Sequence, residues 1–373
     1  AWQGWLDQTR LPLQALQSDL RWTMREGQLG SLEWKGQLAN EDLQAQSQGQ
    51  WRPSGQGGPG VLDLQARVGR INASEVWRYL PLSLPANVRE YVRESVRKGQ
   101  VRDLQVRVRG DLSKVPMLET GDGEFRFSGQ LHDVELAYVP PSLLPAGSLP
   151  WPLLKGLQGT LVFERQGMRL LDASARWGDG AQAVQALRLR AEIPDLAHDA
   201  RLKVQSEIKG AAAQVLRVLR QSPVDRMLSG ALGPASASGM VQGKLQLDIP
   251  LLHAQDTRVQ GSVTLAGNDV QIAPHLPLLG KVQGTLQFSE ASFNLQGVQA
   301  RLLGGTSRLE GGLRSGPVPE GEPRLLIRAQ GQVSAEGLRA ARNLPPLDVL
   351  AQHMRGQTSY SAALGWQGAG AEL

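Results

Sequence analysis

Glycine recurs inside runs of alternating polar and apolar residues, and this pattern limits the chain to few folds. Examples are "SGQLHDVEL" at Gly129, "QGTLVF" at Gly159 and "QGTLQF" at Gly284. Alternation with a period of two is typical of β-strands that have one apolar and one polar face. Glycine within such strands marks bulges, bends or the close approach of another backbone. The sequence therefore predicts a mainly β protein whose many short antiparallel strands form a bent, curling sheet.

The apolar side of each predicted strand must be covered, because an antiparallel sheet of this kind has one face that avoids water. Two arrangements achieve this. The sheet folds over on itself into a packed sandwich, or it curls into an elongated trough that leaves an apolar channel for a ligand. The candidate lining residues of such a channel are Leu104, Val106, Val108, Phe125, Phe127, Leu157, Leu161, Phe163, Val204, Ile208, Val282, Leu286, Phe288, Leu325 and Ile327.

The segment 84–112 is rich in arginine, which raises the question whether the chain binds nucleic acid. It reads as a helix that ends at Gly99, followed by a strand in which Val106 and Val108 face the interior while Arg107 and Arg109 face solvent. Its seven Lys or Arg are interspersed with four Asp or Glu, and the whole chain carries a net charge of only +5. No aromatic residues alternate with the basic ones as stacking platforms. A solvated surface of mixed charge is therefore predicted, with no nucleic-acid partner.

Longer segments repeat as well. "PLLKGLQGTLVF" at 152–163 matches "PLLGKVQGTLQF" at 277–288 with an offset of 125 residues. Three proline-interrupted helical patterns predict helix pairs near 73–98, 211–230 and 334–355. The chain is thus predicted to be one continuous array with units at 1–72, 73–208, 209–333 and 334–373, in which each unit contacts its neighbours.

Several features limit the environment of the chain. Cysteine is absent, so no disulfide framework and no thiolate metal site is expected. The sequence contains no apolar run long enough to span a membrane, and its first residues do not read as a signal peptide. Both ends resemble the interior of a longer chain, and we expect the sequence to be a fragment of one.

Motifs for catalysis are not apparent. The five histidines are scattered, and none belongs to a metal-binding or catalytic pattern. The Asp-Gly pairs in "GDGEF" (121–125) and "WGDG" (177–180) are typical of turns. His132 and Asp133 interrupt the alternation of their strand, which predicts a bulge. The sequence therefore predicts neither an enzyme nor a cofactor. The apolar loop 138–154 either hangs over the open side of a trough or packs as an ordered loop on the sheet edge.

The segment "YLPLSLPANVREYVRESVRKGQVRDLQVRVRGDLSKVPM" (79–117) resembles the YhdP branch of the AsmA-like proteins of Gram-negative bacteria. The repeated strands, "LQGTLVFERQGMRLLDASARWGDG" among them, are similar to the rest of that family. The resemblance implies a periplasmic protein with an inner-membrane anchor outside this segment, and a long β-groove that carries phospholipid acyl chains towards the outer membrane. It implies no catalytic residue. A structural scaffold of the cell envelope, with fully packed sheets and protein partners on its surface, is the alternative from a different class.

Overall fold

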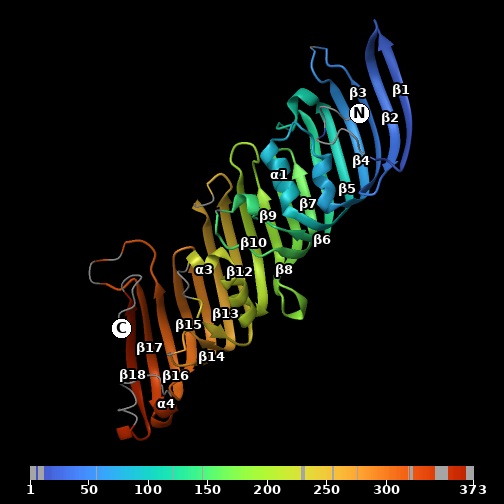
Figure 1. Cartoon of the computed structure of the whole chain (residues 1–373). Coiled ribbons are helices and arrows are strands. Elements are labelled where there is room, and N and C mark those ends of the chain that lie inside the picture. The colour runs from blue at the N-terminus through green and yellow to red at the C-terminus, as the bar shows by residue number, and fades with distance from the viewer. Residues whose placement is uncertain are drawn as a thin grey trace.

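A computed structural model shows an elongated sheet with curved strands, in which β1 and β18 lie at opposite ends (Figure 1). The structure describes residues 6, 12–55, 57–119, 121–144, 146–227, 232–253, 256–274, 276–317, 319, 322–340 and 352–366. The mainly β architecture predicted from the alternation is confirmed. The strands are β1 Ala15–Arg25, β2 Gln28–Ala39, β3 Leu43–Arg52, β4 Val61–Asn72, β5 Val96–Asp111, β6 Gly123–Leu136, β7 Leu154–Glu164, β8 Gly167–Trp177, β9 Val184–Ile193, β10 Arg201–Ala211, β11 Ser236–Ala237, β12 Met240–Pro250, β13 Arg258–Gln271, β14 Leu279–Ser289, β15 Phe293–Leu302, β16 Gly305–Leu313, β17 Leu325–Ser334 and β18 Gln357–Trp366.

The strands form an antiparallel meander. Each long strand pairs with the next long strand in the chain, from β1 with β2 through β17 with β18, and β10 pairs directly with β12. The two-residue β11 pairs with β13 beside the end of β12. β1 and β18 have one described neighbour each, so the described sheet does not close on itself.

Helical segments interrupt the meander after β4, β10 and β17. The first consists of the 3-10 helix η1 (Ala73–Tyr79) and helix α1 (Ala86–Ser95), the second of α2 (Ala212–Arg220) and α3 (Pro223–Met227), and the third begins with α4 (Ala335–Ala340). Six long strands, β5–β10 and then β12–β17, lie between successive segments, and the two-residue β11 precedes the second set. Because neighbouring strands run in opposite directions and six is even, all three segments lie at the same long edge of the sheet, here called the helical edge. Shorter 3-10 turns are η2 Leu112–Lys114, η3 Pro141–Leu143 and η4 Gly180–Gln182.

One predicted boundary is wrong. We expected Gly99 to end the first helix, but α1 ends at Ser95, and β5 begins at Val96. Gly99 lies inside β5 with φ +111°, where a side chain would collide with the backbone of Asp133 and Val134. The glycine therefore permits a close approach of two strands instead of capping a helix. Parts of the predicted second and third helix pairs, 228–230 and 341–351, lie outside the described residues.

A line of irregular pairing near the helical edge bends the sheet. Register shifts occur in successive strand pairs from β5–β6 to β8–β9 and again in β13–β14 and β14–β15. Asp133, Asp172 and Lys281 adopt positive φ there. The bulge predicted at His132 and Asp133 is confirmed by the shift between Leu131 and Val134. Because each bulge bends its strand, their alignment across neighbouring strands curls the sheet along one line, here called the crease.

Three clusters of buried apolar residues lie along this crease and the helical edge. One cluster joins Val134, Leu157 and Ala173 to Ala73 at the start of η1, and a second joins Val282, Val298 and Leu309. A third packs Leu338 of α4 onto Val333 of β17. One face of the sheet is therefore covered along the helical edge, by the curl of the sheet and by the helical segments. The same face is less covered beyond the crease.

Candidate functional site

All fifteen candidate lining residues lie on one face of the sheet, here called the apolar face. Strand register shows this directly, because residues paired across an antiparallel ladder point to the same side. Val108 pairs with Phe125, and Val106 pairs with Phe127. Phe127 pairs in turn with Phe163 of β7.

The same face continues through the middle of the molecule. Leu161 pairs with Leu170 of β8, Leu170 with Ala191 of β9, and Ala191 with Val204 of β10. Leu170 and Ala191 were not among the predicted lining residues. The alternation in "LLDASARW" and "ALRLRAEI" carries the signal that identifies both strands.

Beyond β10 the apolar face extends to the last strands. Val263 pairs with Leu286, Leu286 with Leu295, and Gly311 with both Leu295 and Ile327. A parallel row joins Phe288, Phe293, Leu313 and Leu325. The even-numbered face of 281–288 and the odd-numbered face of 157–163 therefore share one side of one sheet.

Burial divides the apolar face into two parts. Val108, Leu157 and Val282 are buried, with 6%, 3% and 2% of their surface exposed. The other twelve candidates are half-buried, and none is fully exposed. The half-buried residues, which include Phe127, Phe163 and Phe288, lie mostly beyond the crease in a strip that is here called the open strip. Val108, which pairs with Phe125, is a buried exception within it. This strip is neither a packed core nor a normal solvated surface.

The apolar face lacks charge over its described length. In the register-linked rows from β1 to β18, no Asp, Glu, Lys, Arg or His points to this side. Its few polar side chains include Ser47, Ser206 and Ser307, which bond to Trp34, to backbone oxygens of Leu187 and Glu207, and to Tyr360 respectively. An unpaired charge in such surroundings would be costly. The face is thus chemically suited to hydrocarbon and to little else.

The opposite face is polar and laced with ion pairs. Arg107 binds Asp63 and Glu124 on the two neighbouring strands, with 3.0 Å between its Nε and Glu124 Oε2. Hydrogen bonds to these carboxylates raise the pKa of Arg107 above its usual value, with Asp63 the larger cause. The side chain of Arg109 is 64% exposed and that of Arg107 only 23%. Both arginines point away from the apolar face, as predicted, but Arg107 is held in a network and is not freely solvated.

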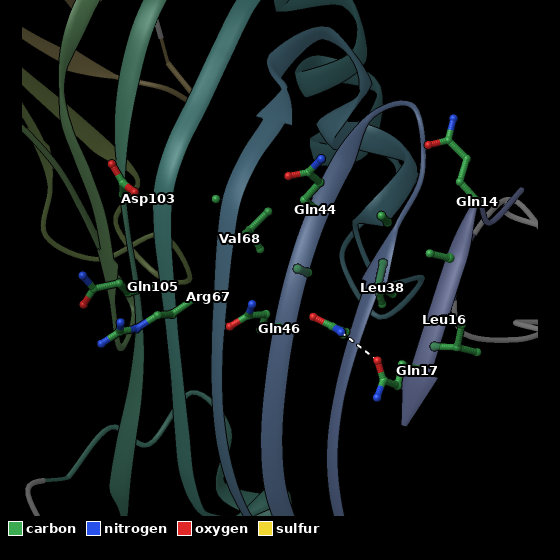
Figure 2. A pocket seen from close by; sticks show the side chains of 15 residues that line it. Gln14, Leu16, Gln17, Leu38, Gln44, Gln46, Arg67, Val68, Asp103 and Gln105 are labelled. Carbon is green, nitrogen blue, oxygen red and sulfur yellow. Dashed lines mark hydrogen bonds between the residues drawn. The ribbon is translucent and has the colours of Figure 1, made fainter. Parts of the chain in front are cut away.

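A cavity of about 1060 Å³ lies over β1–β5 (Figure 2). Its polar side chains follow one cross-strand row of Gln17, Gln37, Gln46, Arg67 and Gln105. Gln37 donates a hydrogen bond of 2.9 Å to Gln17 within this row. The row belongs to the polar face, so this cavity is distinct from the open strip.

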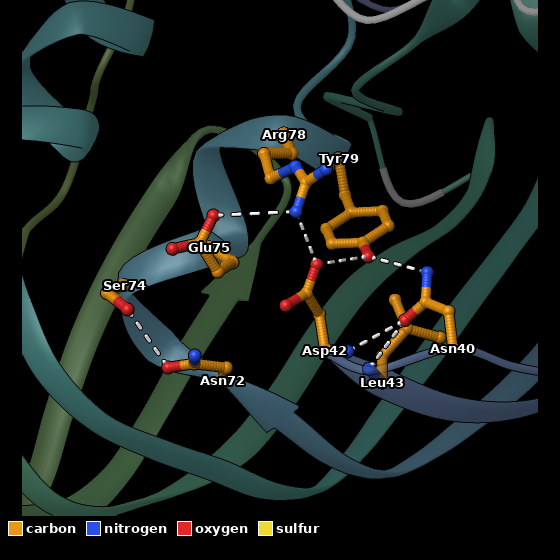
Figure 3. A network of polar contacts seen from close by, with 8 residues as sticks. All are labelled: Asn40, Asp42, Leu43, Asn72, Ser74, Glu75, Arg78 and Tyr79. Carbon is orange, nitrogen blue, oxygen red and sulfur yellow. Dashed lines mark hydrogen bonds and ion pairs between the residues drawn. The ribbon is translucent and has the colours of Figure 1, made fainter. Parts of the chain in front are cut away.

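A polar network fastens the first helical segment to the sheet (Figure 3). Arg78 of η1 binds Asp42 at 2.7 Å, and the Tyr79 hydroxyl donates to the same carboxylate at 3.2 Å. Asn40 donates to the Tyr79 hydroxyl at 2.9 Å and accepts from the backbone of Asp42 and Leu43. Burial is the largest cause that raises the pKa of Tyr79. These contacts fix the helical edge beside the turn between β2 and β3.

The loop 138–154 also packs at the helical edge. The Tyr91 hydroxyl of α1 donates to the Tyr138 carbonyl at 3.0 Å, and Ser142 donates to Glu94. The rings of Tyr138 and Trp151 contact each other, with centroids 6.0 Å apart. These contacts tie the first part of the loop to α1, which agrees with the second of the two arrangements considered for it.

Two features are absent from the described residues. None of their helices is both long and apolar enough to cross a membrane. Nowhere in the described ranges do three metal-ligating side chains gather into a possible ion site.

Comparison with known proteins agrees with the geometry. Residues 3–372 match the family described as "YhdP protein". The chain is similar to the "Intermembrane phospholipid transporter YhdP" of Escherichia coli (strain K12), with 25% identity over 228 residues. That alignment covers 61% of this chain and 17% of the relative, so the chain matches less than a fifth of the relative's length. No solved structure matches. Because the family match covers nearly the whole sequence, the chain belongs to the YhdP family.

Proposed function

We propose that this chain is a segment of a lipid conduit, and that phospholipids cross the periplasm between the inner and outer membranes with their acyl chains on the open strip. The observation that carries the proposal is the uncharged apolar face that runs through the whole described meander. The relative named as an intermembrane phospholipid transporter supports the same function.

The free energy of moving a lipid through water explains why such a face is needed. A two-tailed phospholipid has about 30 methylenes, and each costs about 0.8 kcal/mol when exposed to water. Crossing an aqueous gap without protection would therefore cost on the order of 20 kcal/mol. A continuous apolar surface removes most of this cost without specific polar contacts.

In this proposal the acyl chains of phospholipids are the ligands, and the full-length protein supplies an inner-membrane anchor and the contacts with both membranes. The polar face is available to protein partners of the cell envelope. Chemistry on the lipid is not required, so neither an enzymatic activity nor a cofactor is part of the proposal. We also propose that 73–208 and 209–333 are equivalent units, since each begins with a helical segment and continues with six long strands.

A pair of adjacent substitutions tests the conduit. Leu286 is half-buried on the apolar face between Val263 and Leu295, whereas Gln287 is exposed on the polar face. An aspartate at position 286 lies where passing acyl chains must contact it, and desolvation of the carboxylate opposes that contact. We expect Leu286→Asp in the full-length protein to fold but to fail to complement loss of the protein, while Gln287→Asp complements normally.

The lipid itself is measured by native mass spectrometry of the purified chain after incubation with dioleoylphosphatidylglycerol vesicles. We expect bound lipid on the wild type and on Gln287→Asp, and a marked reduction on Leu286→Asp. Absence of lipid on the wild type, or equal behaviour of the two stably expressed variants, would reject the conduit. The envelope scaffold would then be the better account of this sheet.

A further inference from the structure

Two aromatic side chains on the apolar face are folded down over glycines of a neighbouring strand. Phe288 of β14 pairs with Gly261 of β13, and Trp34 of β2 pairs with Gly49 of β3. A Cβ added at Gly261 would meet the far edge of the Phe288 ring, closer than real Cβ contacts come. A Cβ at Gly49 would meet the far edge of the Trp34 indole in the same way.

This geometry shows how the rings lie. Cross-strand neighbours on one face have Cβ positions about 5 Å apart. The outer atoms of Phe288 occupy the place where a Gly261 side chain would stand, so the ring runs along the sheet instead of projecting from it. The Trp34 ring is held in the same orientation by a hydrogen bond of 3.3 Å from its Nε1 to Ser47 Oγ.

The φ angles of both glycines are compatible with other residues. Neither has the positive φ that would restrict the position to glycine. Each therefore differs from Gly159 and Gly284, whose φ values are +146° and +135°. What a side chain at Gly261 or Gly49 would disturb is chiefly the aromatic ring, although Gly49 also lies close to the Asp63 carbonyl.

We propose that Gly261 and Gly49 are positioning residues, which keep Phe288 and Trp34 flat so that the open strip stays deep enough for acyl chains. This inference rests on the proposed lipid function. A methyl group at either glycine would force the ring to another rotamer, and the available direction is away from the sheet, into the space above the strip. The ring would then occupy volume that an acyl chain needs.

Gly261→Ala tests the inference in the purified chain with dioleoylphosphatidylglycerol vesicles and native mass spectrometry as the readout. We expect Gly261→Ala to bind lipid with an affinity about tenfold weaker than that of the wild type, which corresponds to 1.4 kcal/mol in binding free energy. The affinity is derived from the fraction of protein with bound lipid when lipid is limiting. Gly69→Ala is the matched control, because a Cβ there meets nothing within 4 Å and the residue lies on a strand of the same sheet. Gly49→Ala is the second variant if Gly261→Ala fails to fold.

The double variant Gly261→Ala/Phe288→Ala separates obstruction from loss of stability. Removing the ring should restore lipid binding if the ring blocks the strip, whereas it would worsen a packing defect by leaving a cavity. Restored binding together with a lower melting temperature is the expected result. Unchanged lipid binding by folded Gly261→Ala, or no rescue in the double variant, overturns the inference while leaving lipid binding by the wild type intact. Absence of lipid on the wild type would instead reject the proposed function and this inference with it.

Discussion

The strands β5–β10 and β12–β17 perform the same structural task with different side chains. Their third strands carry glycines at matching positions, Gly159 in β7 and Gly284 in β14, and both adopt strongly positive φ at the crease. Gly159 pairs with Leu131 of the preceding strand, and Gly284 pairs with Leu265. The backbone geometry of the bend is therefore shared by the two sets of strands. Strands β5–β10 are here called the first half, and strands β12–β17 the second half.

The lining of the apolar face differs between them. Phe163 in the first half pairs with Phe127, which also packs edge-to-face on Phe125 with ring centroids 5.1 Å apart. At the equivalent register of the second half, Phe288 pairs with Gly261. The bend thus keeps the same glycine in both places, whereas the lining keeps its apolar character with different residues.

The largest expected loss in the free energy of unfolding comes from substitutions of the glycines at the shared bend. In Gly159→Val the new Cβ would lie 2.6 Å from Ala173 Cβ, and in Gly284→Val it would lie 2.7 Å from Val298 Cα. Valine also avoids positive φ. We expect each variant to lose about 3 kcal/mol or more in the free energy of unfolding, measured by chemical denaturation. Gly121→Ala, where a Cβ meets nothing within 4 Å, should change it by less than about 0.5 kcal/mol. Tolerance of valine in one half only would show that the two bends are not equivalent.

A smaller effect is expected at the buried asparagines that fasten the helical edge. Asn268 donates to the carbonyls of Ser238 and Met240 at 2.7 and 3.0 Å, and accepts from the Ala266 amide. Asn268→Ala leaves these buried groups unpaired, so we expect a loss of about 2 kcal/mol in the free energy of unfolding. Asn40→Ala should cost less, about 1 kcal/mol, because Asn40 is more exposed, at 6% against 2%. The reverse order in thermal and chemical denaturation would contradict this ranking.

Substitutions that break ion pairs of the polar face should lower the free energy of unfolding by less than substitutions of the buried asparagines. Arg107 binds two carboxylates in the first half, whereas Gln246 occupies the equivalent register in the second. We expect Arg107→Gln to cost about 0.5–1 kcal/mol in the free energy of unfolding, and Arg107→Glu somewhat more because Asp63 and Glu124 then repel the new charge. Lipid binding should be unchanged in both variants. Loss of lipid binding at constant fold would show that the polar face takes part in transport.

The smallest effect concerns pH and is confined to the first half. Lys155 binds Asp179 at 2.7 Å, and this hydrogen bond holds the pKa of the Asp179 carboxyl below its usual value. The positions 125 residues later are Gly280 and Gly304, which cannot form the pair. A lowered folded-state pKa means that the pair stabilises the fold at neutral pH and that this contribution is lost as pH falls through that pKa. In an NMR titration, Lys155→Met should return the pKa of Asp179 towards its ordinary value. An unchanged pKa would remove Lys155 as the cause.

Much of the fold could be predicted from sequence because its signals are local. Alternation with a period of two identifies each strand and its apolar side, and glycines within strands indicate the bend. That is why Val106, Phe127 and Leu286 could be placed on one face before the structure was known. Leu170 and Ala191 were missed although the same signal covers them.

Other features depend on how strands pair, which the sequence does not state. Gly99 follows a helical pattern and has the residue type of a helix end, yet its role is set by the bulge at Asp133 on the next strand. The position of Phe288 over Gly261 likewise depends on the register between β13 and β14. Neighbours across strands, not neighbours along the chain, decide both cases.

The meander has a consequence for how such a protein is built. Each long strand needs only the strand before it, so the sheet can assemble progressively as the chain is made, without waiting for a distant partner. It can also grow in evolution by duplication of six strands and one helical segment, since such an insertion leaves every other pairing unchanged. Under the proposed function, the number of such units would set the length of the conduit, and a wider gap between membranes would require more of them.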